Sequence, residues 1–208
     1  LLRGLGAVFL IAFASYWVQV EGLIGDNGIL PAAQFFARVG QRFGEEAFWR
    51  LPSIFWLWPS TIFLHILCCA GCLFSLFLII NNSFSRLWAI LLWLLYISLI
   101  SPGQAFYRFQ WDLLLLEMGF LAIFLSPRLR LKGQAVALAP SPLSILLVRL
   151  LLFRLFFSSG IGKWLRGGET WRGGHALDYH FWTQPIPNPI AYYIHHLPQS
   201  LLHFSTYM

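Results

Sequence analysis

The chain has 208 residues, of which 58% are hydrophobic, 18% aromatic and only 11% charged, with a formal net charge of +6. A soluble globular domain carries about 25% charged residues, so this composition excludes an ordinary soluble domain and is typical of a polytopic membrane protein. In that class the positive charge marks cytosolic loops and anionic lipid surfaces, and it does not indicate a nucleic-acid partner.

Five apolar segments approach the length that crosses the hydrocarbon core of a bilayer, which takes about 20 helical residues. The first has no small-residue cleavage site after its apolar run, so we expect an anchor and not a signal peptide. Residues 1–165 are therefore predicted to form an all-α transmembrane bundle of five helices, or six if a further helix starts within residues 166–208. The predicted spans are residues 5–20, 61–80, 87–100, 112–125 and 143–165.

The connection between the first two spans, residues 21–59, is polar and rich in aromatic residues. A short helix is predicted over residues 32–43, and its apolar side chains have helical spacing, so we expect it on the bilayer surface. The apolar face consists of Phe35, Phe36, Val39 and Phe43. The aromatic residues expected at headgroup level are Phe48, Trp49, Phe55, Trp56 and Trp58.

The distribution of charge predicts a cytosolic amino terminus. With that orientation, residues 21–59, 101–111 and 166–208 lie together on the lumenal or periplasmic side, which we call the exit face. The sequon at residues 81–83 then faces the cytosol and stays unglycosylated. The two short cytosolic loops carry basic residues and no acidic ones, as the positive-inside rule requires. These basic residues are Arg86, Arg128, Arg130 and Lys132.

Three ionisable residues lie inside predicted spans: Glu117, Arg149 and Arg154. Charges in the hydrocarbon core are costly and are usually paired or functional. Given a rise of about 1.5 Å per residue, the Arg154 side chain reaches the depth of Glu117. We expect an intramembrane ion pair between Glu117 and Arg154 that orders the bundle, and a direct functional role is the alternative.

The second span carries three cysteines, Cys68, Cys69 and Cys72, the last two as a CxxC motif. A redox cysteine needs an accessible, electropositive site, which the middle of a span does not offer. We therefore expect these small residues to serve helix packing, and His65 of the same span to donate a hydrogen bond to a neighbouring helix.

The polar and aromatic residues with the most specific pattern follow the fifth span. Residues 154–198 contain RLFFSSGIGKW and ETWRGGHALDYHFWTQPIPNPIAYYIHHLP. With GLIGDNGILPA at 22–32 and FQWDLLLLEMGFLAIFLSP at 109–127, they resemble the lipase maturation factor family, membrane proteins that help secreted lipases fold and assemble. The functional signature implied by this resemblance consists of Lys163, Trp171, Arg172, Asp178, His180, Gln184, Pro187, His195 and His196.

The resemblance implies a chaperone-like, non-enzymatic maturation factor of the endoplasmic reticulum membrane or a bacterial inner membrane. Its expected partners are membrane lipids and a secreted lipase client, and no cofactor is expected. Family members continue into a soluble carboxy-terminal region, so we expect such a region downstream of residue 208. Trp182 departs from the family pattern, which often has an acidic residue at that position.

Two alternatives remain open. The first is a structural or accessory subunit of a larger membrane complex that reuses this fold. The second is an enzyme, because S-G-I-G-K-W-L is similar to the A-G-x-K-K-L pattern of vitamin K-dependent gamma-carboxylases, in which the lysine matched by Lys163 is the base. The competing interpretation is that Lys163 snorkels to the membrane interface.

The histidines show no spacing typical of a metal site. His195 and His196 are adjacent, so they point in different directions on a helix, and His175 and His180 are five residues apart. We expect no bound metal, and hydrogen-bonding roles for the histidines within a cap on the exit face. The expected hydrogen-bond partners are Asp178, Gln184 and Asn188.

Overall fold

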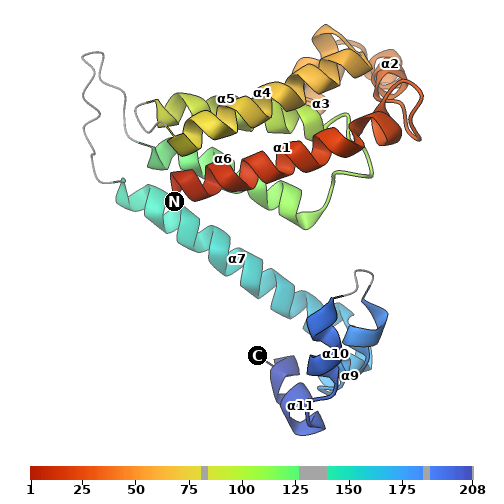
Figure 1. Ribbon diagram of the computed structural model, residues 1–208, viewed down its shortest axis with the longest axis vertical. Helices are drawn as coiled ribbons and strands as arrows, with labels where there is room; N and C mark the ends of the chain where they lie inside the picture. The colour runs from red at the N-terminus through yellow and green to blue at the C-terminus, as the bar shows by residue number, and fades with distance from the viewer. Residues whose placement is uncertain (81–83, 127–139, 185–187, 208) are drawn as a thin grey trace. The chain divides into compact units, whose positions relative to one another are not determined.

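The computed structural model describes residues 1–80, 84–126, 140–184 and 188–207, and all regular secondary structure in these ranges is helical (Figure 1). This confirms the predicted all-α class. The chain divides into two compact units, Leu1–Val148 and Arg149–Met208. Some predicted features lie outside the described residues: the sequon at 81–83, the basic residues Arg128, Arg130 and Lys132, and Pro187.

The long helices correspond to the predicted spans. They are α1 (Leu2–Ile24), α4 (Thr61–Ile80), α5 (Ser85–Ile100), α6 (Gln110–Leu125) and α7 (Pro142–Arg166), which begins in the first unit and continues into the second. The bounds of α4 match the prediction, whereas α1 extends at both ends beyond the predicted 5–20. The extension at its carboxy end includes Glu21. The prediction stopped before this residue because it followed the apolar residues alone, whereas the helix continues beyond them.

Within the described ranges, α1, α4 and α7 are long and apolar enough to cross a membrane, and α5 is a shorter apolar helix. The 16 residues of α5 or of α6 give a helix of about 24 Å, less than the roughly 30 Å of a hydrocarbon core. Length and composition thus identify three candidate spans, and the expected count of five is not reached by this criterion.

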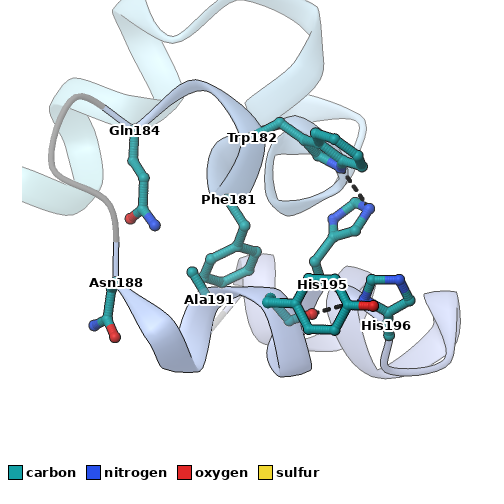
Figure 2. Close-up of a pocket in the computed structure, with 8 residues that line it drawn as sticks. Phe181, Trp182, Gln184, Asn188, Ala191, His195 and His196 are labelled. Carbon is teal, nitrogen blue, oxygen red and sulfur yellow. Dashed lines mark hydrogen bonds between the residues drawn. The ribbon is translucent and has the colours of Figure 1, made fainter.

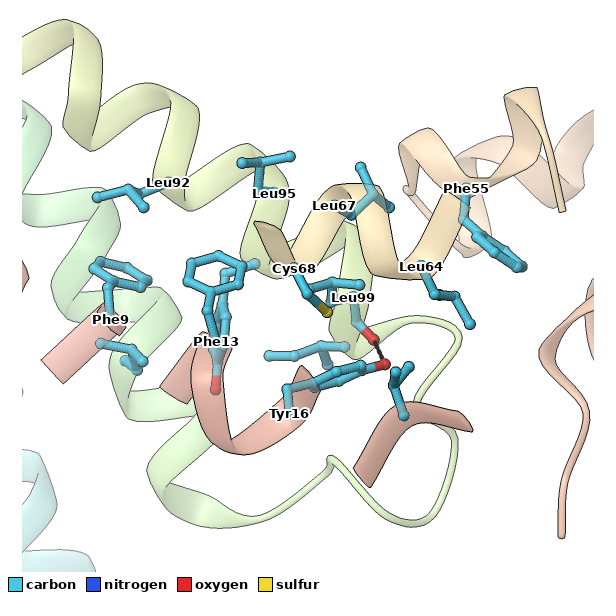
Figure 3. Close-up of a cluster of buried hydrophobic side chains, with 14 of the residues drawn as sticks. Phe9, Phe13, Tyr16, Phe55, Leu64, Leu67, Cys68, Leu92, Leu95 and Leu99 are labelled. Carbon is cyan, nitrogen blue, oxygen red and sulfur yellow. Dashed lines mark hydrogen bonds between the residues drawn. The ribbon is translucent and has the colours of Figure 1, made fainter. Parts of the chain in front are cut away.

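The core of the first unit lies where α1 packs against α4, α4 against α5, and α5 against α6. Figure 3 shows its aromatic centre. The rings of Phe9 and Phe13 on α1 each meet Tyr96 of α5 edge-on, with centroids 5.6 and 5.4 Å apart. The hydroxyl of Tyr16 donates a 2.7 Å hydrogen bond to the carbonyl of Leu99, which fixes the height of α1 against α5.

Small residues allow α1 and α4 to approach closely, as predicted. A Cβ atom added to Gly71 would overlap the ring of Phe13. Cys68 is buried in the core, Cys69 is exposed on the surface of α4, and Cys72 is half-buried, all three as free thiols. The expected packing role is therefore met by Cys68 and in part by Cys72, whereas Cys69 faces away from the core of the first unit.

A hydrogen bond between side chains also joins α1 to α4. Trp17 Nε1 donates to His65 Nδ1 at 2.8 Å. The expected helix–helix hydrogen bond of His65 is present, but His65 is its acceptor and not its donor. The indole has only a donor to offer, so the tryptophan determines the role of the histidine.

The connections at residues 21–59 and 101–111 meet at one end of the first unit. Gln104 Nε2 donates to the Leu30 carbonyl at 2.9 Å, and Ser101 Oγ donates to the Pro52 carbonyl at 3.0 Å. Beneath them, Tyr96 donates a 2.8 Å hydrogen bond to the buried carboxylate of Asp112. These contacts place the two connections on the same face of the unit.

The amphipathic helix α2 (Ala32–Phe43) has the predicted bounds, and short helices follow it: η1 (Gly44–Glu46), α3 (Ala47–Arg50) and η2 (Ile54–Leu57). Phe36 is buried, with its ring centroid 4.9 Å from Phe55 and 4.5 Å from Trp56. Phe55, one of the aromatic residues expected at headgroup level, is fully buried under α2 and faces the core of the first unit, not lipid; its depth in the membrane stays a prediction. Trp49 remains 90% exposed and is available to an interface.

Candidate functional site

The signature residues lie in the second unit, on the end of α7 and on a group of short helices. These helices are α8 (Gly168–Arg172), α9 (Ala176–Thr183), α10 (Pro189–His195) and α11 (Gln199–Tyr207). Gly168, the first residue of α8, and Gly174, two residues after its end, have φ angles of 72° and 76°, a region that favours glycine. The side chain of Asn188 accepts a 2.9 Å hydrogen bond from the Ile190 amide and so caps α10.

Lys163 and Trp171 form one contact at the end of α7. The Lys163 Nζ lies 4.7 Å from the centroid of the Trp171 ring, a cation–π geometry. A Cβ atom at Gly167 would overlap the same ring, so only glycine lets the indole reach α7. Both signature residues thus serve the turn from α7 into α8.

Arg172 also contacts the end of α7. Its Nε donates to the Trp164 carbonyl at 2.9 Å and its Nη2 to the Leu165 carbonyl at 3.1 Å. These carbonyls lie in the last turn of α7, where helix carbonyls lack partners and the helix dipole is negative. The guanidinium therefore caps α7 and ties α8 to it.

A pocket with a cavity volume of about 250 Å³ opens between α9 and α10 (Figure 2). In its wall Trp182 Nε1 donates a hydrogen bond to His195 Nε2. Because Nε2 accepts, a neutral His195 carries its proton on Nδ1, an atom that is buried without a hydrogen-bond partner among the described residues. The pocket is lined by Phe181, Trp182, Gln184, Asn188, Ala191, Tyr192, His195 and His196.

His195 and His196 point in different directions, as the adjacent positions predict, with their ring planes at 90°. His196 Nδ1 donates to the Tyr192 carbonyl at 2.7 Å. Gln184 and Asn188, expected as histidine partners, lie across the pocket in Figure 2, and Asn188 serves as the cap of α10. His180 is exposed and has its ring beside Phe181.

Asp178 does bind histidines, in a cluster that spacing along the chain does not predict. Its Oδ2 lies 3.2 Å from His175 Nδ1 and 3.2 Å from His203 Nε2. Burial by itself raises the pKa of the Asp178 carboxyl, but hydrogen bonds with His203 and His175 outweigh it and hold that pKa below its usual value. His203 comes 25 residues after Asp178, so no short motif contains both.

The structure thus places seven of the nine signature residues at three sites: the α7–α8 junction, the pocket and the aspartate–histidine cluster. His180 belongs to none of these sites, and Pro187 lies outside the described residues. Trp182, which departs from the family pattern, lines the pocket as a hydrogen-bond donor. Sequence reasoning missed His203, for which the only available signal was that it follows the HHLP motif in the same cap. The predicted ion pair between Glu117 of α6 and Arg154 of α7 would join the two units, and it stays a prediction.

Comparison with known proteins gives one family and several curated relatives. The family described as lipase maturation factor transmembrane domain matches residues 1–208. Lipase maturation factor 2 of Xenopus laevis is 41% identical, over 98% of this chain and 30% of its own length. Lipase maturation factor 1 of Homo sapiens is 37% identical, over 99% of this chain and 37% of its own length. The chain therefore spans about a third of the length of these relatives, and no solved structure matches it.

Proposed function

Because the chain belongs to the lipase maturation factor family, we propose that it is the membrane domain of a protein that assists the folding and assembly of secreted lipases. The family and the three long apolar helices make it an integral membrane protein. The proposed client-facing part is the exit-face cap, which we define as helices α8 to α11. The role of this cap is chaperone-like: it holds a partly folded client without changing its covalent structure.

The observation that carries this proposal is the exposure of large aromatic side chains on the cap. Trp182 and Tyr193 are each 73% exposed, and they lie on helices too short to cross a bilayer. Contiguous exposed apolar surface marks sites that bind proteins or membranes. A partly folded lipase exposes apolar segments of its own, which such rings bind with little loss of conformational freedom. The other exposed aromatic residues of the cap are Tyr179, Tyr192, Phe204 and Tyr207.

The proposed topology has five spans, a cytosolic amino terminus and a cap on the lumenal side of the endoplasmic reticulum membrane or the periplasmic side of a bacterial inner membrane. Support comes from the first unit, where the two polar connections meet at one end. Arg86 donates to the carbonyls of Ile123 and Ser126, at the carboxy end of α6. Arg86 thus lies at the end of the helices that the proposed topology assigns to the cytosol, where the positive-inside rule expects basic residues. In this topology α5 and α6 cross beside α1 and α4 of the same unit.

The geometry around Lys163 supports a structural role for this residue. A lysine that acts as a base must be neutral before it accepts a proton, whereas a cation–π contact with the Trp171 ring uses the charged ammonium group. An accessory role in a larger membrane complex would instead appear as co-purification with other membrane subunits in fixed stoichiometry.

The test is complementation of cells that lack the gene, with secreted lipase activity and lipase antigen measured together. Tyr193→Ala removes an exposed ring whose hydroxyl makes no hydrogen bond to another described residue. Trp49→Ala removes a 90% exposed ring of the first unit and is the matched control. We expect Tyr193→Ala to lower activity per unit of antigen and Trp49→Ala to leave it near the wild-type value. The double variant Tyr193→Ala/Trp182→Ala tests the cap more severely. If it is expressed normally and supports full lipase activity, the cap is not the part that binds the client.

A further inference from the structure

Three side chains with metal-binding groups converge where the start of α9 meets α11. His175 immediately precedes α9, Asp178 lies in its first turn, and His203 lies on α11. His175 Nδ1 is 3.2 Å from Asp178 Oδ2 and 3.0 Å from His203 Nε2, and His203 Nε2 is 3.2 Å from the same oxygen. None of the three residues lines the pocket between α9 and α10, so the cluster is a separate feature of the cap.

The triangle formed by these three atoms has the size of one face of a metal coordination shell. Ligand atoms about 2.0–2.1 Å from a tetrahedral Zn²⁺ lie roughly 3.3–3.4 Å from one another. On the face of an octahedral site with similar bonds they lie roughly 3.0 Å apart. The three separations, 3.0, 3.2 and 3.2 Å, lie just below the tetrahedral range and at or slightly above the octahedral value.

Hydrogen bonds alone do not satisfy all three contacts. Each ring nitrogen carries either one N–H or one lone pair. If both His175 Nδ1 and His203 Nε2 carry protons, they repel each other at 3.0 Å; if one accepts from the other, its lone pair faces the Asp178 carboxylate. A cation at the centre of the triangle is attracted by all three atoms at once. In addition, Asp178 Oδ1 is buried without a hydrogen-bond partner among the described residues.

The donor set selects a transition metal over calcium or magnesium. Two imidazole nitrogens with one carboxylate oxygen suit Zn²⁺ and its neighbours in the first transition row, whereas Ca²⁺ and Mg²⁺ prefer oxygen ligands. The side chains of His175, Asp178 and His203 are 54%, 22% and 35% exposed, so solvent reaches the triangle and supplies further ligands.

We propose that His175, Asp178 and His203 bind a divalent transition-metal ion, Zn²⁺ fitting their chemistry best, and that the ion fastens α11 to the start of α9. The turn that leads into α9 already packs closely on α11: a Cβ atom at Gly174 would lie 2.8 Å from the Tyr207 ring, and the Tyr207 hydroxyl donates to the Arg172 carbonyl at 3.2 Å. The bound ion therefore joins two segments of the cap that are distant in sequence and determines whether α11 stays docked.

The first test uses the protein purified in detergent, treated with a chelator and titrated with Co²⁺, whose visible absorption reports its ligands. We expect one Co²⁺ bound per chain and its displacement by one equivalent of Zn²⁺. His203→Ala removes a ligand and should lower the affinity by more than the roughly 10–100-fold that loss of an outer-shell partner costs. His180→Ala, on the same helix as Asp178, is the matched control for metal affinity and should bind as the wild type does.

Asp178→Cys separates a metal site from a hydrogen-bonded cluster. A thiolate ligates Co²⁺ and Zn²⁺, so this variant should retain binding and gain a sulfur-to-cobalt charge-transfer band, even if the hydrogen bonds of the carboxylate are lost. If His203→Ala does not fold, the spectrum of Asp178→Cys still tests whether the cluster binds metal. Wild-type protein that binds neither ion, His203→Ala that binds as tightly as wild type, or Asp178→Cys without the sulfur band would each overturn the proposal.

Discussion

At the scale of single residues, Gly71 determines how closely α1 and α4 approach. The ring of Phe13 occupies the space where a side chain at this position would begin, and Ser75 Oγ donates to the Gly71 carbonyl at 2.7 Å. The Ser75 hydroxyl thus hydrogen-bonds within α4, and α4 is an uninterrupted helix at the point where it lies closest to α1. Lipid tails are as apolar as the helix side chains, so the hydrophobic effect does not drive helices together in a membrane. Association depends on close van der Waals packing, which small residues allow.

We predict that Gly71→Ala destabilises the first unit by about 1–3 kcal/mol, the usual cost of overpacking a core. The added methyl group would overlap the Phe13 ring and force α1 away from α4. Thermal unfolding of the detergent-purified variant measures the loss. Gly22→Ala in α1 is the control, because a Cβ atom there meets nothing within 4 Å. Equal melting temperatures for the two variants would contradict the packing argument.

Tyr107 provides a second prediction, concerning alkaline pH. Its ring stacks on Tyr16 with centroids 3.9 Å apart, and its hydroxyl is buried without a hydrogen-bond partner among the described residues. Burial, followed by the nearby Cys68 and Asp112, raises the pKa of the phenol from 10.0 to about 12. The folded state thus binds this proton more tightly than the unfolded state, so its contribution to stability is complete below pH 10 and decreases between pH 10 and about 12.

We expect Tyr107→Phe to unfold less steeply than wild type as the pH rises from 10 to about 12, and to be as stable as wild type at neutral pH. Phenylalanine keeps the stacked ring and lacks the ionisable group, and the hydroxyl that is removed has no hydrogen bond to another described residue. Chemical denaturation of both proteins across this pH range is the measurement. A variant as sensitive to alkali as the wild type would show that another group controls the transition.

At the scale of elements, the end of α7 depends on a residue that lies beyond it. Arg172 of α8 caps the last turn of α7 with two separate N–H groups, one to Trp164 and one to Leu165. Lysine has the same charge but lacks the rigid fork that reaches two carbonyls together. The chemistry of this position therefore requires arginine and not merely a positive charge.

We predict that Arg172→Lys loosens the α7–α8 junction while leaving the first unit unchanged. Amide hydrogen exchange should speed up over residues 163–175, with exchange in α1 and α4 as in wild type, because only local hydrogen bonds are lost. Arg166→Lys makes the same chemical change in the last turn of α7 and is the matched control. Faster exchange in both variants would point to the helix dipole, and not to the two hydrogen bonds of Arg172.

At the scale of the whole molecule, the proposed function requires the cap and the amino terminus to lie on opposite sides of the membrane. Five spans satisfy this requirement and four do not, since an odd number of crossings separates the two ends. A lipase in the secretory pathway meets only the exit face. The assignment of the cap therefore requires that α11 and the amino terminus of α1 lie on opposite sides of the membrane.

We expect an impermeant maleimide added to sealed vesicles to label Ser205→Cys from the exit side only and Arg3→Cys from the cytosolic side only. Both positions are exposed. The native Cys69 is an internal control: it is exposed on α4 but within a predicted span, so lipid should protect it until the membrane is dissolved. Labelling of the cap from the cytosolic side would exclude contact with an exported client.

The sequence predicted the helices well because helix formation and membrane partitioning depend on neighbouring residues. The apolar run of 61–80 is the helix α4, and the apolar spacing and flanking Pro31 and Gly44 of 32–43 give α2 its ends. The burial of Phe55 was not predicted, for the converse reason. Its burial depends on Phe36, nineteen residues earlier, and the pattern of either segment alone does not report that contact.

The amino-acid sequence by itself determined that this is an all-α membrane protein of the lipase maturation factor family. Composition, the length of apolar runs and short motifs such as LDYH and HHLP can be read from the sequence without knowing which residues meet in space. Only the tertiary structure decided that Gly71 lies under Phe13, that Trp182 donates to His195, and that His203 joins Asp178. These contacts link residues 13 to 58 positions apart, and they form only where two helices meet in space, so no local period or spacing along the chain encodes them.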